Sequence, residues 1–443
     1  MGISADTPGT EGTTPSGVGD GSSSASWNYT FVGLSLVAVL SLGPLLLEPK
    51  PIQFVAPHSI AAVRWAAKGI VVALMILAIV VANRAPRTSD RERGGRIGLR
   101  NLALALLAGL MTLWHLFAVD TRRTEVRPDV HVWEWQRDLY LHILNGKAQD
   151  VVSAPLAPHG YRPLPYGFTR SLELFTGDWL FSCVAYRWFF TFWLLWGCYQ
   201  FVGVFHDRTR SWLAVAIVGI LYPLSVQFYW GQLTDPLSHA LFVLGLICIV
   251  QDRWLELAAA LALGVMAKET AVLLVPAYGA CYLLRGGPTL ARTALLGSIA
   301  IVACLAVRLP LGWTSDLKSV NGTTGLMIGT NLGIGKPLYR TQVPLYQSYL
   351  HPLLFVGVFV PVLALRWRGI DSRLRALILT LTPLLLASSL CFSWLYESRN
   401  YMPLLPVLAA AAFPPLGRRN HSPATSTNAT TANAARLTPF PQR

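Results

Sequence analysis

The sequence predicts an all-α protein that crosses a membrane many times, with about 12 transmembrane helices and a large first extracytoplasmic loop bearing amphipathic helices. Three observations predict this class. Hydrophobic residues make up 53% of the 443 residues, and charged residues only 13%. The mean hydropathy is +0.46. Lys and Arg gather in short segments between long apolar runs, so we expect a multi-pass protein of the inner or plasma membrane.

The net charge and the cysteines exclude two other classes. A formal charge of +14 is also found in nucleic-acid-binding proteins, but here the basic residues flank apolar runs, which is typical of a membrane topology signal. We therefore expect no nucleic-acid partner. The six cysteines are scattered and lack the spacing of a disulfide framework or a zinc site. They are expected to be core residues.

The N-terminal part is expected to hold a tail and a helical hairpin. Residues 1–26 are rich in Gly, Ser and Thr and contain no basic residue, which predicts a disordered cytoplasmic tail. Two apolar runs within 27–83 predict an extra hairpin. The arginines between 84 and 100 are the strongest cytoplasmic signal, so the main transmembrane domain is expected over 84–417.

A third span at 102–119 is expected to leave the cytoplasm and lead to a large outer loop, 120–180. Within this loop Val132, Trp135 and Leu139 recur at helical spacing. That spacing predicts an amphipathic helix lying on the membrane surface.

The stretch 254–284 is almost unbroken apolar sequence, interrupted by Lys268 and Glu269. A single helix of that length would rise about 45 Å, half as long again as a bilayer core of about 30 Å. We therefore expect two short helices that meet at the charged pair on the outer face. A mutual ion pair that only locks the two helices is the alternative.

The remaining elements follow the same rule of apolar runs between basic clusters. Further spans are predicted at 181–205, 212–229, 236–250, 294–309, 350–365, 376–392 and 401–416, with a second outer loop at 310–349 and a disordered cytoplasmic tail at 418–443. Both termini are then cytoplasmic.

This topology places the chemistry-bearing residues at the outer ends of spans: Asp129, Glu134, Asp138, His159, Arg162, Asp178, Asp235, Lys268, Glu269, Glu397 and Arg399. Acids suit proton removal from an acceptor, and basic residues suit the binding of an anionic group. An extracytoplasmic site has no ready supply of nucleotide-activated substrate, so a lipid phosphate carrier is the expected source.

Several of these residues also have structural interpretations. Asp178 follows a glycine and is typical of a helix cap. Thr234 or Asp235 is a good N-cap before a proline in the first turn. Asp129 and Asp138 lie on a half-polar segment, where a solvated face is the alternative. Arg399 is either an anion ligand or a side chain that snorkels to the interface.

Four short motifs occur in order along the chain and on the same predicted face. They are Tyr161-Arg162-Pro163-Leu164-Pro165, Thr234-Asp235-Pro236-Leu237-Ser238, Ala267-Lys268-Glu269-Thr270 and Glu397-Ser398-Arg399-Asn400-Tyr401. Together they resemble the bacterial integral-membrane glycosyltransferases of the GT-C superfamily, including mannosyltransferase-like and arabinosyltransferase-like members. The resemblance covers roughly residues 101–415.

The resemblance implies a polyprenyl-phosphate-linked sugar donor and inverting transfer to an extracytoplasmic lipid, glycan or protein acceptor. An outer-loop carboxylate acts as general base, here Asp129, with Asp138 as the other candidate. By position, the phosphate ligands would be Arg162, Lys268 and Arg399, the orienting acids Glu269 and Asp235, and further substrate-binding residues Tyr161, Glu397 and Tyr401.

One feature departs from the family pattern. The family's acidic doublet in the first outer loop is absent, because Asp129 is followed by Val130. Some members of the superfamily use a divalent metal and others none. The departure leaves both the base and the metal requirement open, and no metal ligand is assigned.

Two other functions compete with the transferase. A transporter or flippase for a lipid-linked or small polar substrate should carry polar residues through the membrane depth and on both faces, whereas the inner halves of these spans are nearly purely apolar. A non-catalytic membrane assembly subunit would tolerate loss of Asp129 and Lys268 while still needing the spans.

Overall fold

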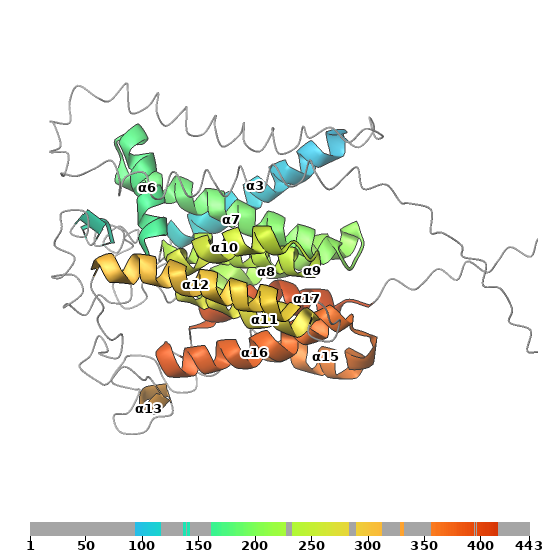
Figure 1. Ribbon diagram of the computed structural model, residues 1–443. Coiled ribbons are helices and arrows are strands. Elements are labelled where there is room, and N and C mark those ends of the chain that lie inside the picture. Colours follow the sequence, from blue (N-terminus) through green and yellow to red (C-terminus); the bar gives the residue numbers. More distant parts are fainter. Residues whose placement is uncertain are drawn as a thin grey trace, which may run out of the picture.

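The computed structural model describes residues 94–116, 136–138, 140–141, 161–226, 233–282, 289–311, 328–331, 356–393, 395 and 397–414. Every regular element in these ranges is a helix, so the predicted all-α class is confirmed for this part of the chain. The helices lie roughly side by side in one elongated bundle (Figure 1). The predicted N-terminal hairpin, both predicted tails, and Asp129, Glu134 and His159 lie outside the described residues.

The first part of the bundle is built from five helices. Their bounds are α3 Gly94–Leu116, α6 Pro163–Thr176, α7 Trp179–Gly203, α8 Arg208–Val226 and α9 Thr234–Val250. α6 begins with a proline and ends at Gly177, whose φ of 66° closes the helix in the left-handed conformation. Asp178 then caps α7 by accepting a hydrogen bond from the Phe181 amide at 3.0 Å, which confirms its predicted capping role.

The apolar stretch interrupted by charges forms two short helices, as predicted. α10 covers Trp254–Ala267, the 3₁₀ turn η3 covers Glu269–Leu273, and α11 covers Leu274–Tyr282. Lys268 between them has an extended backbone, with φ −164° and ψ 132°. A Cβ on Gly264 would lie 2.8 Å from the Cβ of Ala271, so the chain folds back closely at the break.

The second part completes the bundle. Its elements are α12 Thr289–Leu311, α13 Ile328–Asn331, η6 Gly357–Phe359, α15 Val360–Arg366, η7 Trp367–Gly369, α16 Ser372–Phe392, η8 Ser398–Leu404 and α17 Leu405–Ala412. α13 lies within the predicted second outer loop. The Asn331 amide nitrogen donates to the carbonyls of Leu390 at 2.9 Å and Ser393 at 2.8 Å. It thereby satisfies carbonyl groups at the end of α16.

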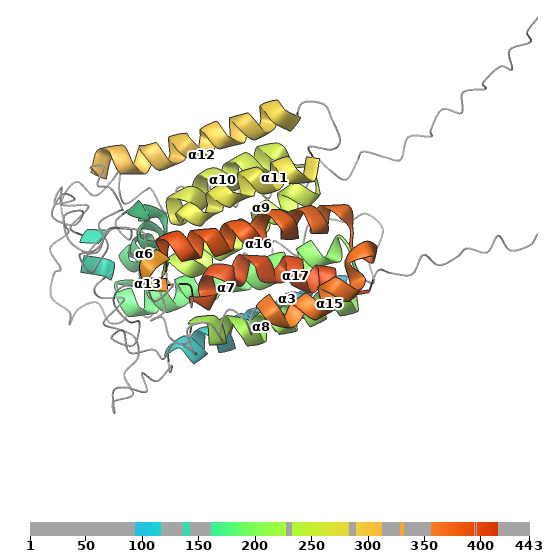
Figure 2. The ribbon, with the colours of Figure 1, turned by 90° about the horizontal axis from the view of Figure 1, so that it is seen from below.

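Two helices in the described ranges are long and apolar enough to cross a membrane: Thr289–Leu309, with a mean hydropathy of 2.1, and Ser372–Phe392, with 1.8. Shorter apolar helices cover Arg100–Gly109, Thr234–Val250 and Trp254–Ala267. α12 lies at the edge of the bundle beside α10 and α11 (Figure 2). It exposes large apolar side chains, namely Leu290, Leu295, Ile301, Val302 and Leu309.

The end of the bundle that holds the α7–α8 turn is closed by basic side chains on helix-end carbonyls. Arg373 donates to the Val250 carbonyl at 2.8 Å, and Arg366 donates to the Ala412 carbonyl at 2.7 Å. His206, in the turn after α7, lies 2.7 Å from the Ala410 carbonyl through Nε2. Cations and N–H donors at helix C-termini satisfy carbonyls that lack a partner within the helix.

Candidate functional site

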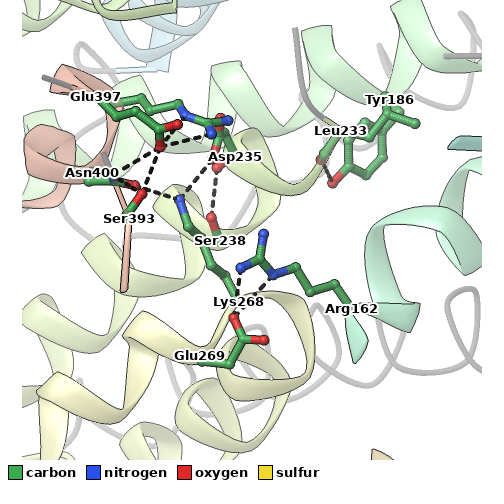
Figure 3. A network of polar contacts seen from close by, with 11 residues as sticks. Arg162, Tyr186, Leu233, Asp235, Ser238, Lys268, Glu269, Ser393, Glu397 and Asn400 are labelled. Atoms are coloured by element: carbon green, nitrogen blue, oxygen red, sulfur yellow. Dashed lines mark hydrogen bonds and ion pairs between the residues drawn. The ribbon is translucent and has the colours of Figure 1, made fainter. Parts of the chain in front are cut away.

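The centre of the candidate site is Asp235, in the first turn of α9, whose side chain is 1% exposed. Its two carboxylate oxygens accept from two different cations (Figure 3). Lys268 Nζ lies 3.0 Å from Oδ1, and Arg399 Nη1 lies 3.1 Å from Oδ2. These cations come from sequence positions 33 and 164 residues away. One carboxylate therefore ties together α9, the α10–η3 break and η8.

The alternative of Thr234 or Asp235 as the N-cap of α9 is wrong. The N-cap position is Leu233, and no side chain caps the helix. Instead the Tyr186 hydroxyl donates to the Leu233 carbonyl at 2.6 Å and fixes the start of α9. The Asp235 carboxylate is held instead by the full positive charges of Lys268 and Arg399, one on each of its oxygens.

Glu397 organises the other side of the site. Its Oε2 accepts from Arg399 Nη2 at 2.9 Å, from Ser393 Oγ at 2.9 Å and from Asn400 Nδ2 at 3.1 Å. Lys268 Nζ also donates to Asn400 Oδ1 at 3.3 Å. We refer to Asp235, Lys268, Ser393, Glu397, Arg399 and Asn400 as the inner cluster. It contains two carboxylates and two cations, so its formal charges balance, which is the condition for burying charge.

The snorkelling alternative for Arg399 is wrong. The residue is 6% exposed, and its guanidinium points into the inner cluster rather than toward the surface. The tight 3₁₀ turn of η8 places Arg399 and Asn400 beside Asp235 and Lys268. A desolvated guanidinium needs an anion beside it, and Asp235 and Glu397 both provide one.

A second group of charges, the outer cluster, consists of Tyr161, Arg162, Glu269 and Arg308. Arg162 Nε and Nη2 both donate to Glu269 Oε2, at 3.1 and 2.9 Å. Arg308 Nη2 lies 3.8 Å from Glu269 Oε1, and its guanidinium stands 4.6 Å from the centre of the Tyr161 ring. The Glu269 side chain is 32% exposed. The Arg162 and Arg308 side chains are each 11% exposed, so the outer cluster reaches the surface mainly through Glu269.

The predicted alternative of a mutual Lys268–Glu269 ion pair is also wrong. Lys268 binds Asp235 in the inner cluster, whereas Glu269 binds Arg162 in the outer one. The extended backbone of Lys268 explains this difference, because successive side chains along an extended segment point to opposite sides. The two adjacent residues therefore link the two clusters (Figure 3).

Two fully buried polar side chains lie near the inner cluster without a hydrogen-bond partner among the described residues. They are the Tyr166 hydroxyl on α6 and the imidazole of His239, one helical turn after Asp235. The His239 ring packs edge-on against Tyr222, at 5.9 Å between centroids and 83° between planes. Both buried groups lie close enough to the Asp235 carboxylate to interact with it electrostatically.

Sequence reasoning missed His239, Tyr166, Arg308, Ser393 and Asn400. A single histidine in an apolar helix is more often a core residue, so His239 gave a weak signal, although its spacing of four from Asp235 puts both on one helix face. Arg308, in the last turn of α12, directly follows an apolar run. Basic residues that set membrane topology occupy the same position, so the sequence did not mark Arg308 as a site residue.

The other predicted residues are placed as follows. Asp138 is exposed on the short helical segment 136–138, which agrees with the helical spacing noted there, and it is not a member of either cluster. The Tyr401 hydroxyl donates to the Leu395 carbonyl at 3.2 Å and supports η8. Four of the cysteines are buried, as expected, and two are half-buried.

The described residues contain no group of three or more His, Cys, Asp or Glu side chains arranged to hold a metal ion. Asp235 is unsuited to a divalent metal because both of its oxygens already accept from cations.

Comparison of the sequence with protein-family models, with curated proteins and with solved structures found no match. The resemblance to glycosyltransferases therefore stays a prediction from the four sequence motifs.

Proposed function

We propose that the chain is a GT-C-like membrane glycosyltransferase that moves a sugar from a polyprenyl-phosphate donor to an extracytoplasmic acceptor in the cell envelope. One observation carries this proposal. The four motifs of the resemblance interact directly through their charged side chains, in pairs that are 33, 107 and 164 residues apart. A shared site explains why residues so far apart in sequence are charged and lie together.

The distribution of side chains supports placing this bundle in a lipid bilayer. Charged residues are buried inside it, including Asp235, Lys268 and Arg399, while α12 exposes Leu, Ile and Val on its outer face. Several large apolar side chains exposed along one helix are typical of a surface that contacts a partner or a membrane. A bilayer favours this arrangement, because charges inside membranes face the bundle interior and pair with one another. We propose about 12 spans with both termini cytoplasmic.

The two clusters suit different roles. In the outer cluster, Arg162 and Arg308 are positioned to bind the donor phosphate, because paired guanidinium groups recognise phosphate oxygens. Lys268 and Arg399 are already held by Asp235, so we assign them to positioning: they keep η3 and η8 in place around the site. This assignment revises the direct phosphate contact that the resemblance implies for Lys268 and Arg399.

The proposed reaction is a single inverting displacement. The acceptor hydroxyl oxygen forms a bond to the anomeric carbon while the bond from that carbon to the phosphate oxygen breaks. The hydroxyl proton passes to the general base, Asp129 or Asp138, and the leaving polyprenyl phosphate takes the bonding electron pair. Cations beside the phosphate stabilise the negative charge that develops on it.

The arrangement disfavours a transporter. A transporter is expected to carry polar residues through the membrane depth and on both faces. At the end opposite the two clusters, Arg366, Arg373 and His206 are instead engaged with helix-end carbonyls. A non-catalytic assembly subunit is the second candidate. The observation that favours it is the balanced charge of the inner cluster, since such a network also serves a purely structural role.

Gene deletion and complementation test the proposal. Strains carrying wild type, Asp129→Asn, Asp138→Asn or the control Asp207→Asn would be profiled for lipid-linked and surface glycans by mass spectrometry. Asp207 caps α8 at the opposite end of the bundle and is exposed. We expect the deletion to remove one sugar from the glycans and to accumulate its polyprenyl donor.

We expect wild type and Asp207→Asn to restore the sugar, while one of the two outer-loop variants fails to do so despite normal expression. Unchanged glycans in the deletion strain, or full restoration by both outer-loop variants, would refute the catalytic assignment. The assembly-subunit function would then be preferred.

A further inference from the structure

Glu269 has an unusual position for a carboxylate that only stabilises the fold. It stands between two arginines that come from separate elements, the start of α6 and the last turn of α12. Its Oε2 accepts both hydrogen bonds from Arg162, at 3.1 and 2.9 Å. Its Oε1 lies 3.8 Å from Arg308, beyond hydrogen-bonding distance, and accepts no hydrogen bond among the described residues.

The charge and size of the outer cluster fit a larger anion better than they fit Glu269. Among the described residues, Arg162 and Arg308 both face the Glu269 carboxylate, and a group with more acceptor oxygens makes additional contacts to them. A phosphate has three or more acceptor oxygens arranged around a tetrahedral centre, and it can accept from both arginine forks at once. The planar Glu269 carboxylate, held by Arg162, stays 3.8 Å from Arg308 Nη2.

The backbone beside Glu269 is fixed while its side chain is accessible. Lys268, the preceding residue, is anchored to Asp235 at 3.0 Å and to Asn400 at 3.3 Å. The Glu269 side chain is 32% exposed, in contrast to 1% for Asp235. A rotation of this side chain is therefore enough to vacate the space between the arginines, without any movement of η3.

We propose that Glu269 is a displaceable internal anion that occupies the phosphate position of the outer cluster until the phosphate of a ligand replaces it. The inference rests on the proposed function, which supplies the polyprenyl phosphate as ligand. Glu269 competes with this ligand for Arg162 and Arg308. Removing its charge therefore strengthens phosphate binding, whereas removing an arginine weakens it.

The test measures affinity for a polyprenyl monophosphate, using the full-length protein in phosphatidylcholine nanodiscs. We expect Glu269→Gln to bind about fivefold more tightly than wild type, the size expected when a partly exposed ion pair no longer competes. Arg308→Gln should bind at least about tenfold more weakly, because it loses a charge-assisted contact to the phosphate. Asp207→Asn, the matched carboxylate variant at the other end of the bundle, should bind as wild type does.

Two further ligands distinguish a lipid phosphate from free phosphate as the ligand of the outer cluster. The neutral polyprenol should bind all variants equally. Inorganic phosphate should show the same order of variants at lower affinity; an effect confined to inorganic phosphate would overturn the lipid as ligand. Equal or weaker binding of polyprenyl monophosphate by Glu269→Gln would overturn the displaceable anion.

If Glu269→Gln does not fold, Glu269→Asp provides the same test, since it keeps the charge but withdraws it from the arginines by one methylene. It should bind more tightly than wild type, and unchanged or weaker binding overturns the proposal. Because binding is measured without sugar transfer, the two proposals can fail separately. Tighter binding by Glu269→Gln together with unchanged glycans in the deletion strain would retain the displaceable anion and reject the transferase.

Discussion

Asp235→Asn is the most informative single perturbation of the inner cluster. It removes the carboxylate that neutralises two cations, Lys268 and Arg399, while the side-chain volume hardly changes. The cluster then passes from formal balance to an excess of one positive charge in a site where Asp235 is 1% exposed. Removing one partner of a buried ion pair costs about 3–5 kcal/mol, because the remaining charge is left without compensation.

The matched comparison is Glu269→Gln, which removes the carboxylate that pairs with Arg162 in the outer cluster. This side chain is 32% exposed, and an exposed ion pair contributes only about 0–1 kcal/mol. We therefore expect a difference of about 3 kcal/mol in the free energy of unfolding between the two variants. Equilibrium denaturation in mixed detergent micelles, followed by tryptophan fluorescence, measures this difference.

A compensating second substitution completes the test. Lys268→Met in the Asp235→Asn background removes one cation and leaves Arg399 paired with Glu397, so the cluster is formally neutral again. The double variant should be more stable than Asp235→Asn alone, a strong departure from additivity. Equal losses in Asp235→Asn and Glu269→Gln, or additive losses in the double variant, would refute the charge-balance argument for the inner cluster.

Three further predictions concern the fold of the bundle. Burial lowers the pKa of His206 in the folded state below its usual value of 6.5. At a pH between the folded-state pKa and the unfolded-state pKa, the unfolded state therefore binds more protons than the folded state does. Stability should therefore be constant well above pH 6.5 and should decrease as the pH falls below it; His206→Gln should flatten this part of a pH–stability profile. Gly264→Ala should cost about 1–3 kcal/mol, because the new Cβ meets Ala271 at 2.8 Å, as measured by denaturation. Asn331→Ala should cost about 2 kcal/mol, because carbonyl groups at the end of α16 lose their donor; hydrogen exchange at η8 should rise with it.

One of these predictions has a matched control variant, and each has an outcome that would contradict it. Gly98→Ala in α3 has no heavy atom within 4 Å of the added carbon, so it should be neutral or slightly stabilising. Equal effects of Gly98→Ala and Gly264→Ala would argue against a steric cause at the α10–η3 break. A pH profile that keeps its acidic decrease in His206→Gln would assign that decrease to another group. Unchanged exchange at η8 in Asn331→Ala would mean that α13 does not support the site.

The sequence located the local features correctly where neighbouring residues decide them. α7 and α16 match the predicted apolar runs to within a few residues at each end, because burial of long hydrophobic segments dominates their folding. Asp178 was identified as a cap from its place after a glycine and before an apolar run. The break at Lys268 followed from charges that a continuous apolar helix does not tolerate.

The sequence did not determine which charges pair with which. Asp235 was compatible with a helix cap, and Lys268 with an ion pair to its neighbour, because only partners nearby in the chain are visible in a sequence. The actual partners are 33 and 164 residues away from Asp235, and 107 residues separate Glu269 from Arg162. His239 and Tyr166 also gained their significance only from the elements packed around them.

The sequence by itself thus determined that the chain is helical and apolar, that it breaks at Lys268 and that several motifs carry charge. The tertiary structure alone decided that these motifs form a balanced inner cluster and, together with Arg308, an outer cluster in which two arginines face the partly exposed Glu269. The physical reason is how far apart in the chain the interacting residues lie. Helix formation and capping depend on residues a few positions apart, whereas the energy of a buried charge depends on every charge that the fold brings within a few ångströms.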